Sequence, residues 1–236
     1  MLLSYDLGMP ESEFHIGGLS VAVQDYAKTI YALEEEEGCT ATTTALAERL
    51  AVRPASVVGM VRKLVALDLA THEPYRGVRL TERGRAVALE VIRHHRLLEL
   101  FLVESLGMGW DEVHAEAERL EHALSEELEE MIAARLGNPT LDPHGDPIPS
   151  RELEIAADHT RSLYDLTPGE EGRFSRISVE DPEMLRYLTD RGISPGSALE
   201  LIERQPFDGP VYVRFGDQVH VLGAVLARAM RVEETE

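Results

Sequence analysis

Two segments of the sequence place histidine and carboxylate side chains at helical spacing. In segment 111–122, four such residues follow the spacing i, i+4, i+7 and i+8, which puts them on one face of a helix. In segment 95–99, two more lie four residues apart. Oxygen and nitrogen ligands on facing helices are how helical bundles build metal sites. The candidate ligands are His95, Glu99, His114, Glu118, Glu121 and His122.

A solvated charged face is the alternative interpretation of this pattern. The opposite faces of the same segments already carry solvating charge, which favours the metal site.

The residues ahead of these ligands predict a winged helix-turn-helix. The apolar stripe within 19–37 predicts a first helix, and segments 44–51 and 54–67 predict two short helices across a tight connection. Segment 70–80 offers two short strands around a turn, which would form the wing. Arg53 and the residues after it would open the recognition helix, whose N-terminal residues face base edges in this motif.

The charge distribution supports a DNA-facing head. The whole chain carries a formal charge of −20, yet the window from Arg53 to Arg96 holds nine basic and four acidic residues, a balance of +5. Phosphate contacts need such local positive charge. The candidate DNA-binding residues are Arg53, Pro54, Ala55, Ser56, Gly59, Arg62, Lys63, Tyr75 and Arg76.

The rest of the chain predicts helices followed by a small β domain. Thr81 is placed to cap a long helix that ends near Gly107, and two shorter helices follow up to residue 137. Four prolines within 138–149 predict a linker. Short alternating runs beyond about residue 163 predict a small β-barrel with one helix near 184–189. The expected fold class is therefore mainly α with a small β domain.

Three motifs resemble the diphtheria-toxin-repressor family of metal-dependent transcriptional regulators. They are the string DYAKTIYALEEEEG at 25–38, the pair His95 and Glu99, and the pattern HAEAExxEH at 114–122. The resemblance extends from about Ser20 to the C-terminus. It implies a primary metal site of Asp25, Glu118, Glu121 and His122, and an ancillary site of His95, Glu99 and His114, to which Glu180 of an SH3-like domain is a candidate addition.

The resemblance also suggests which metal acts. Asp25 and Glu118 stand where iron-type members carry methionine and cysteine, which is similar to the manganese-type members. Carboxylates with imidazoles suit Mn²⁺ or Fe²⁺, and the low rank of Mn²⁺ in the affinity series implies that Zn²⁺ or Cd²⁺ also binds in vitro. Lys28 replaces a second acid of the manganese-type members, which argues against their two-metal site.

The resemblance implies four segments and a set of partners. The segments are a winged helix-turn-helix domain at 1–80, a helical metal-binding and dimerisation domain at 81–142, a linker at 143–163 and an SH3-like (ferrous-transport-A-like) domain at 164–236. The partners are a second copy of the chain and a pseudo-palindromic double-stranded DNA operator. The expected function is metal-dependent repression of metal-homeostasis genes, without enzymatic activity.

Two other functions remain open at this point. A winged-helix regulator could sense an organic ligand, with the acidic stripe only solvating its helix. A di-metal hydrolase is disfavoured because Glu118-x-x-Glu121-His122 differs from the His-x-x-Glu-His pattern at its first ligand. The single cysteine, Cys39, and the lack of a long apolar stretch or signal sequence lead us to expect a cytoplasmic protein without membrane contact.

Overall fold

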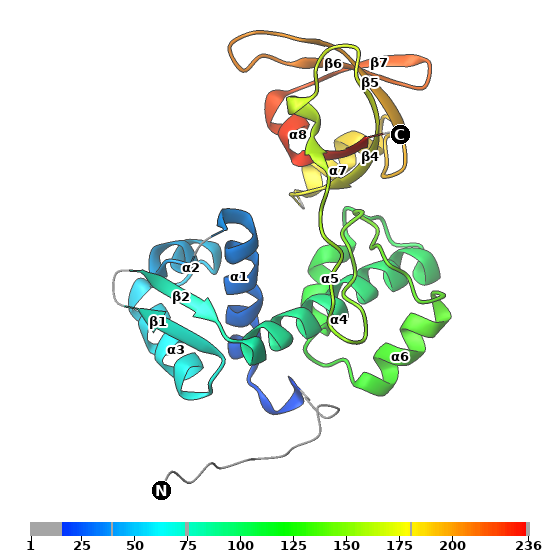
Figure 1. Cartoon of the computed structure of the whole chain (residues 1–236). Coiled ribbons are helices and arrows are strands. Elements are labelled where there is room, and N and C mark those ends of the chain that lie inside the picture. Colours follow the sequence, from blue (N-terminus) through cyan, green and yellow to red (C-terminus); the bar gives the residue numbers. More distant parts are fainter. Residues whose placement is uncertain (1–15, 39, 74–75, 180, 235–236) are drawn as a thin grey trace, which may run out of the picture. The chain divides into compact units, whose positions relative to one another are not determined.

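The computed structural model describes residues 16–38, 40–73, 76–179 and 181–234 (Figure 1). The chain divides into two compact units, 1–90 and 91–236, and each is described here by itself. Within the described ranges, no helix has both the length and the apolar character needed to cross a membrane.

The first unit has the predicted winged helix-turn-helix. A short 3₁₀ turn, Ile16–Gly18, precedes the first helix. The two strands pair antiparallel, Ala70 opposite Leu80, and form the wing. The elements are α1 (Val21–Glu37), α2 (Thr43–Arg49), α3 (Pro54–Ala66), β1 (Ala70–Glu73) and β2 (Gly77–Leu80).

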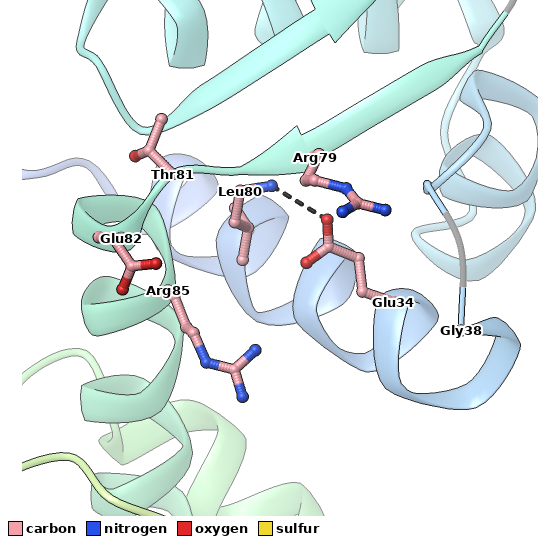
Figure 2. A pocket seen from close by; sticks show the side chains of 7 residues that line it. All are labelled: Glu34, Gly38, Arg79, Leu80, Thr81, Glu82 and Arg85. Carbon is pink, nitrogen blue, oxygen red and sulfur yellow. Dashed lines mark hydrogen bonds between the residues drawn. The ribbon is translucent and has the colours of Figure 1, made fainter.

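Buried apolar side chains and one half-buried carboxylate hold this unit together. Helix α3 turns Val57, Val61 and Leu64 into the core. Glu34 on α1 accepts a hydrogen bond of 3.1 Å from the backbone N–H of Leu80, which ties α1 to the wing (Figure 2). Burial raises the pKa of Glu34. The polar pocket around this contact is lined by Glu34, Gly38, Arg79, Leu80, Thr81, Glu82 and Arg85.

The long helix α4 (Glu82–Leu106) begins where the sequence predicts. The hydroxyl of Thr81 accepts a hydrogen bond from the Gly84 N–H, as expected of an N-cap residue. In the second unit, α4 packs with α5 (Val113–Leu120) and α6 (Glu126–Arg135), and Ser125 caps α6. Their shared apolar core is Leu97, Leu98, Leu100, Ala117, Ile132, Ala133 and Ile148.

The proline-rich stretch that follows α6 is packed into the second unit. The sequence suggested a linker here, but Asp142, His144, Gly145 and Ile148 are all buried. Arg96 on α4 donates a hydrogen bond to the carbonyl of Pro147. The proline-rich stretch is therefore a turn packed against α4.

The C-terminal part forms one six-stranded sheet in the order β3-β8-β4-β5-β6-β7, with antiparallel pairing at each of these junctions. The end strands β3 and β7 are not paired with each other in the described residues, so the closed barrel predicted from the sequence is not shown. The elements are β3 (Arg161–Ser162), the 3₁₀ turn η2 (Leu163–Asp165), β4 (Glu171–Ile177), α7 (Pro182–Thr189), β5 (Ala198–Arg204), β6 (Val211–Phe215), β7 (Gln218–Leu222), α8 (Ala224–Ala229) and β8 (Met230–Glu234).

Two elements of this part have no counterpart in the sequence-based prediction. Strand β3 has only two residues, too few to show alternation. Helix α8 has six residues and follows β7 directly, so it lacks the length of a periodic pattern. The predicted helix near 184–189 is present as α7, and Asp181 caps it.

Gly84 sets the closest approach between α4 and the wing. A Cβ at this position would lie 1.8 Å from the carbonyl oxygen of Leu69. We expect Gly84→Ala to lower the free energy of unfolding of the first unit by about 1–3 kcal/mol, as overpacking does. Gly59→Ala is the matched control, because nothing lies within 4 Å of its Cβ and alanine is favoured in a helix by about 1 kcal/mol. Urea unfolding followed by circular dichroism measures both, and equal stability of the two variants would contradict the expectation.

Candidate metal centre

Glu99 lies among three histidines on α4, α5 and the turn after α6, of which His95 and His144 are buried and His114 is half-buried. Its side chain is fully buried. One carboxylate oxygen, Oε1, is 2.9 Å from His95 Nε2 and 3.3 Å from His114 Nδ1. The other oxygen, Oε2, is 3.5 Å from Nδ1 of His144. A buried carboxylate needs such partners because desolvation of an isolated charge is costly.

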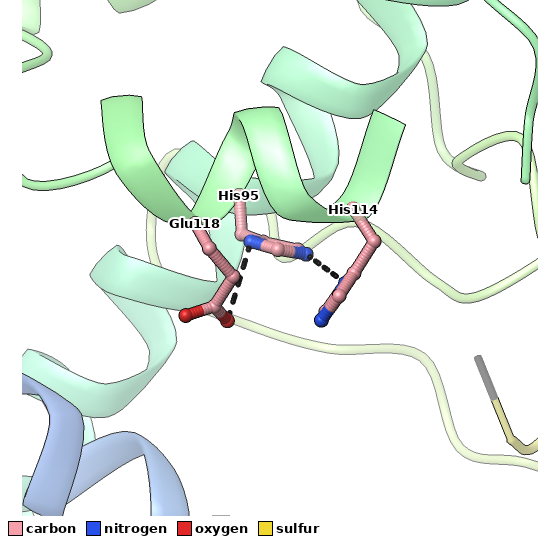
Figure 3. Close-up of side chains that lie close together, drawn as sticks. All are labelled: His95, His114 and Glu118. Atoms are coloured by element: carbon pink, nitrogen blue, oxygen red, sulfur yellow. Dashed lines mark hydrogen bonds and ion pairs between the residues drawn. The ribbon is translucent and has the colours of Figure 1, made fainter. Parts of the chain in front are cut away.

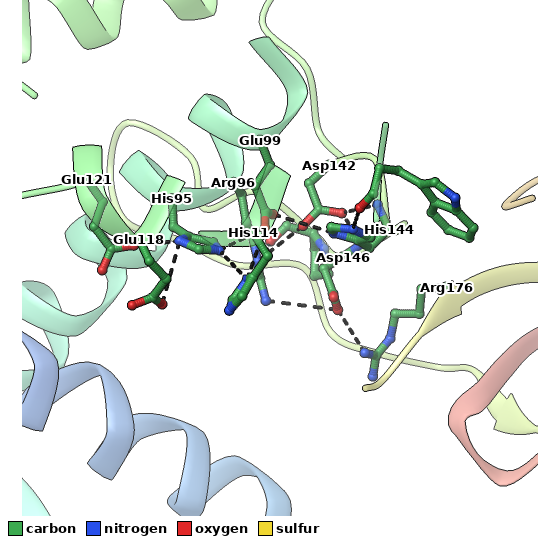
Figure 4. A network of polar contacts seen from close by, with 12 residues as sticks. His95, Arg96, Glu99, His114, Glu118, Glu121, Asp142, His144, Asp146 and Arg176 are labelled. Carbon is green, nitrogen blue, oxygen red and sulfur yellow. Dashed lines mark hydrogen bonds and ion pairs between the residues drawn. The ribbon is translucent and has the colours of Figure 1, made fainter. Parts of the chain in front are cut away.

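Glu118 and Glu121 approach the same histidine from the end of α5. Glu121 Oε2 is 2.5 Å from His95 Nδ1, and Glu118 Oε1 is 3.9 Å from that nitrogen (Figures 3 and 4). His122 Nε2 lies 3.4 Å from Glu121 Oε1. His94 helps to fix this end of α5, because its Nδ1 lies 3.0 Å from the Glu121 carbonyl oxygen. The structure therefore brings four predicted ligands next to His95, and His122 next to Glu121.

A three-residue group of buried ligands extends this network. Glu99, Asp142 and His144 each offer one ligand atom, and these atoms lie within 4.8 Å of one another. Glu99 Oε2, Asp142 Oδ2 and His144 Nδ1 are buried and have no hydrogen-bond partner among the described residues. These atoms still face charged groups, because His144 Nδ1 lies 3.5 Å from Glu99 Oε2 and Arg96 Nε lies 3.7 Å from Asp142 Oδ2. They form an ion-paired group whose atoms could act as ligands to a cation. Two carboxylate oxygens and one imidazole nitrogen fit a divalent cation such as Mn²⁺ or Fe²⁺.

Backbone hydrogen bonds fix Asp142 and His144 in the orientation that leaves these atoms open. Asp142 Oδ1 accepts from the N–H groups of His144, at 2.8 Å, and Asp146, at 2.9 Å, which leaves Oδ2 for the centre (Figure 4). His144 Nε2 lies 2.7 Å from the Trp110 carbonyl oxygen and donates to it, because that oxygen accepts only. Metal-binding histidines usually hold their second nitrogen in this way.

Burial and the facing charges shift the pKa values of Glu99, Asp142 and His144. Burial would raise the pKa of Glu99, but the facing imidazoles of His114, His144 and His95 hold it well below its usual range. Burial and the nearby carboxylates of Asp146 and Glu99 raise the pKa of Asp142 to about 7. Burial would lower the pKa of His144, but Glu99 and Asp142 raise it to about 9.

Two further predicted ligands lie outside α4 and α5. Asp25 lies on α1, in the first unit, half-buried. Glu180 lies outside the described residues. Conversely, the sequence-based prediction missed Asp142 and His144. The available signal is Asp-x-His-x-Asp at 142–146, a cluster of ligand-type residues beside the prolines that predict a linker.

The predicted DNA-binding side chains share the exposed face of α3. Arg53, Pro54, Ala55, Ser56, Gly59, Arg62 and Lys63 are all exposed, whereas every buried residue of the helix lies on the opposite face. In the wing, Arg76 is exposed and pairs with Glu73 at 3.2 Å. Tyr75 lies outside the described residues.

Comparison with known families assigns all three parts of the chain. Residues 18–78 match the N-terminal DNA-binding domain of iron-dependent repressors, and residues 81–150 match the metal-binding and dimerisation domain of the same repressors. Residues 161–234 match the FeoA domain. These matches together cover most of the chain.

Individual relatives agree over nearly the full length. The chain is 35% identical to the iron-dependent repressor IdeR of Mycobacterium tuberculosis, over 89% of this chain and 95% of that protein. It is 33% identical to the diphtheria toxin repressor of Corynebacterium efficiens, over 89% of this chain and 94% of that one. A solved manganese-dependent transcriptional repressor in complex with manganese superposes with a TM-score of 0.82 at 41% identity, covering 90% of this chain and 100% of the other.

We expect His144→Ala to remove one divalent-cation site per chain. The variant deletes a buried candidate ligand from a group of three residues that each offer one ligand atom, and these atoms lie within 4.8 Å of one another. Equilibrium dialysis against Mn²⁺, with metal counted by atomic absorption, should show about one ion fewer per chain. The exposed His159→Ala should bind as the wild type does. An unchanged ion count in His144→Ala would show that this group is not a metal site.

Proposed function

This chain belongs to the iron-dependent repressor family, and on that premise we propose which of its residues hold the metal and how they control DNA binding. The family consists of metal-dependent transcriptional repressors that bind operator DNA as homodimers through a winged helix-turn-helix. The hydrolase and the organic-ligand regulator considered above are therefore set aside. The observation that carries the proposal is the convergence of buried carboxylates and imidazoles on α4, α5 and the turn after α6.

The proposed metal ligands form two groups. The first group is the primary site implied by the family resemblance, and Asp25 would join it from α1. The second group contains the three buried open atoms, with the imidazoles of His95 and His114 beside it. The first group is Asp25, Glu118, Glu121 and His122, and the second is Glu99, Asp142 and His144.

The ligand types favour Mn²⁺ or Fe²⁺ as the physiological metal. Every ligand in both groups is a carboxylate or an imidazole, and none is a thiolate. Zn²⁺ and Cd²⁺ should bind in vitro, because Mn²⁺ ranks low in the affinity series. Bound in these groups, a divalent cation supplies positive charge that several facing carboxylates share.

Asp25 would couple metal binding to DNA binding. Its carboxylate belongs to the DNA-binding unit, whereas the other three primary ligands belong to the second unit. Sharing one ion would constrain α1 relative to the helical part. A homodimer reads two half-sites about 34 Å apart or a multiple of it, so such a constraint sets how well both recognition helices fit. Metal need only favour the DNA-competent form by about 1–3 kcal/mol to act as co-repressor.

The exposed face of α3 and the wing supply the contacts to DNA. Arg62, Lys63 and Arg76 are placed to bind phosphates, and the small residues at the start of α3 allow the helix to approach the groove closely. With few long side chains for base contacts, operator choice would depend partly on DNA shape. We place this regulator in the cytoplasm, where its DNA target and reduced Cys39 both belong.

Glu118→Ala tests the primary site. We expect metal-dependent binding of an operator fragment, followed by fluorescence anisotropy with and without Mn²⁺, to weaken by about 5- to 150-fold, the range of allosteric couplings of 1–3 kcal/mol. Glu116→Ala is the matched control, since Glu116 lies on the same helix and pairs with Arg119. If Glu118→Ala kept the full metal response, the assignment of this site would be wrong.

Lys63→Ala tests the phosphate contacts. We expect it to weaken binding to all DNA sequences alike and to reduce the slope of log K against log salt by about 1, as loss of one phosphate contact does. Arg135→Ala, exposed on α6, is the control and should leave the slope unchanged. An unaltered slope in Lys63→Ala would place this side chain away from the DNA backbone.

A further inference from the structure

The buried turn that carries His144 lies directly against strand β4 of the C-terminal sheet. The Ile177 N–H donates a hydrogen bond of 3.1 Å to the His144 carbonyl oxygen. The next residue, Gly145, approaches so closely that a Cβ would lie 2.0 Å from the Ser175 carbonyl oxygen and 2.8 Å from the Arg176 Cβ. Its φ of +87° also favours glycine. Only glycine permits this contact between turn and strand.

Side chains hold the same contact on both sides of the turn. Arg176 on β4 donates to Asp146 Oδ1 at 2.8 Å and also pairs with Asp158. On the other side, the Trp110 ring stacks on the His144 imidazole, with 5.8 Å between centroids. The same indole packs against the apolar core of the C-terminal sheet and donates a hydrogen bond to Thr189 of α7. Trp110 therefore contacts both the ligand and the sheet.

Different contacts orient the three proposed ligands, Glu99, Asp142 and His144. Glu99 is a residue of α4, and its orientation follows from that helix and the histidines around it. Asp142 is oriented by two backbone N–H groups of its own turn. His144 is tied to the same turn by the bond from its N–H to Asp142, and in addition it contacts β4 through Ile177 and stacks on Trp110, which packs on the sheet.

We propose that the C-terminal sheet, through β4 and Trp110, positions His144 and thereby sets the cation affinity of the Glu99, Asp142 and His144 group. The inference rests on the proposed function, because it requires that this group binds a divalent cation. Loss of a group that orients a metal ligand lowers affinity by about 10- to 100-fold. Linkage is reciprocal, so cation binding also strengthens docking of the sheet on the turn.

Gly145→Ala in the full-length chain tests the proposal directly. Trp110 is the only tryptophan of the chain, so its emission reports on the neighbourhood of His144 during titration of chelator-stripped protein with Mn²⁺. We expect the midpoint of the emission change to rise by about 10- to 100-fold. Gly169→Ala is the matched control, since its φ is +92° but nothing lies within 4 Å of its Cβ. The control separates backbone strain from the collision with β4 and should keep the wild-type midpoint.

A second readout needs no metal. In chelator-stripped Gly145→Ala, the amide of Ile177 should exchange with deuterium faster than in the wild type, because its acceptor, the His144 carbonyl, has moved. Should Gly145→Ala fail to fold, Arg176→Met removes the side-chain link to Asp146 and should shift the Mn²⁺ midpoint in the same direction.

The outcomes separate this inference from the function on which it rests. A wild-type midpoint and wild-type exchange in the folded Gly145→Ala variant, or a wild-type midpoint in Arg176→Met, would overturn the positioning role while the metal site stands. If wild type and His144→Ala gave the same emission response to Mn²⁺, the metal group itself would be wrong, and the inference would fall with it.

Discussion

A fully buried carboxylate, Glu99, constrains the whole helical part of this protein. Its charge is removed from water, and the chain compensates with three imidazoles drawn from α4, α5 and the turn after α6. Those imidazoles in turn face further carboxylates, Glu121 and Asp142 among them. The packing of these elements therefore depends on the charge balance around Glu99, and under the proposed assignment a bound cation would change that balance.

Under the proposed assignment, the same arrangement couples metal binding to DNA binding through a single shared carboxylate. The helical part supplies ligands that already converge, and the DNA-binding unit supplies one more carboxylate, Asp25, under the proposed assignment. The recognition helix needs no metal chemistry of its own, and its exposed face consists of small and basic residues. Chemistry and recognition are thus kept on separate elements, which is how a fold can keep its DNA-binding head while its metal site changes.

Backbone contacts fix the conformation of the turn at 142–146. Asp142 uses one oxygen to hold the turn and leaves the other at the centre, and Gly145 admits β4 to within contact distance. A loop that holds metal ligands in a buried position must satisfy its own polar groups. Here the strand and the turn satisfy each other through the bond from Ile177 to His144.

The sequence by itself determined the helices α1 to α7, the wing, the face of α3 that is exposed and six of the metal-type side chains, because helical periodicity and capping are local properties. The six-residue helix α8 was too short for such a pattern. Resemblance of the sequence motifs added the family. Tertiary structure alone decided that a proline-rich stretch is a buried turn, that Asp142 and His144 face Glu99, and that the six strands form one sheet without a demonstrated closure. The physical reason is range: these features arise from contacts between residues far apart in the chain, such as Glu99 with His144 or Gly145 with Ser175, and no local pattern encodes them.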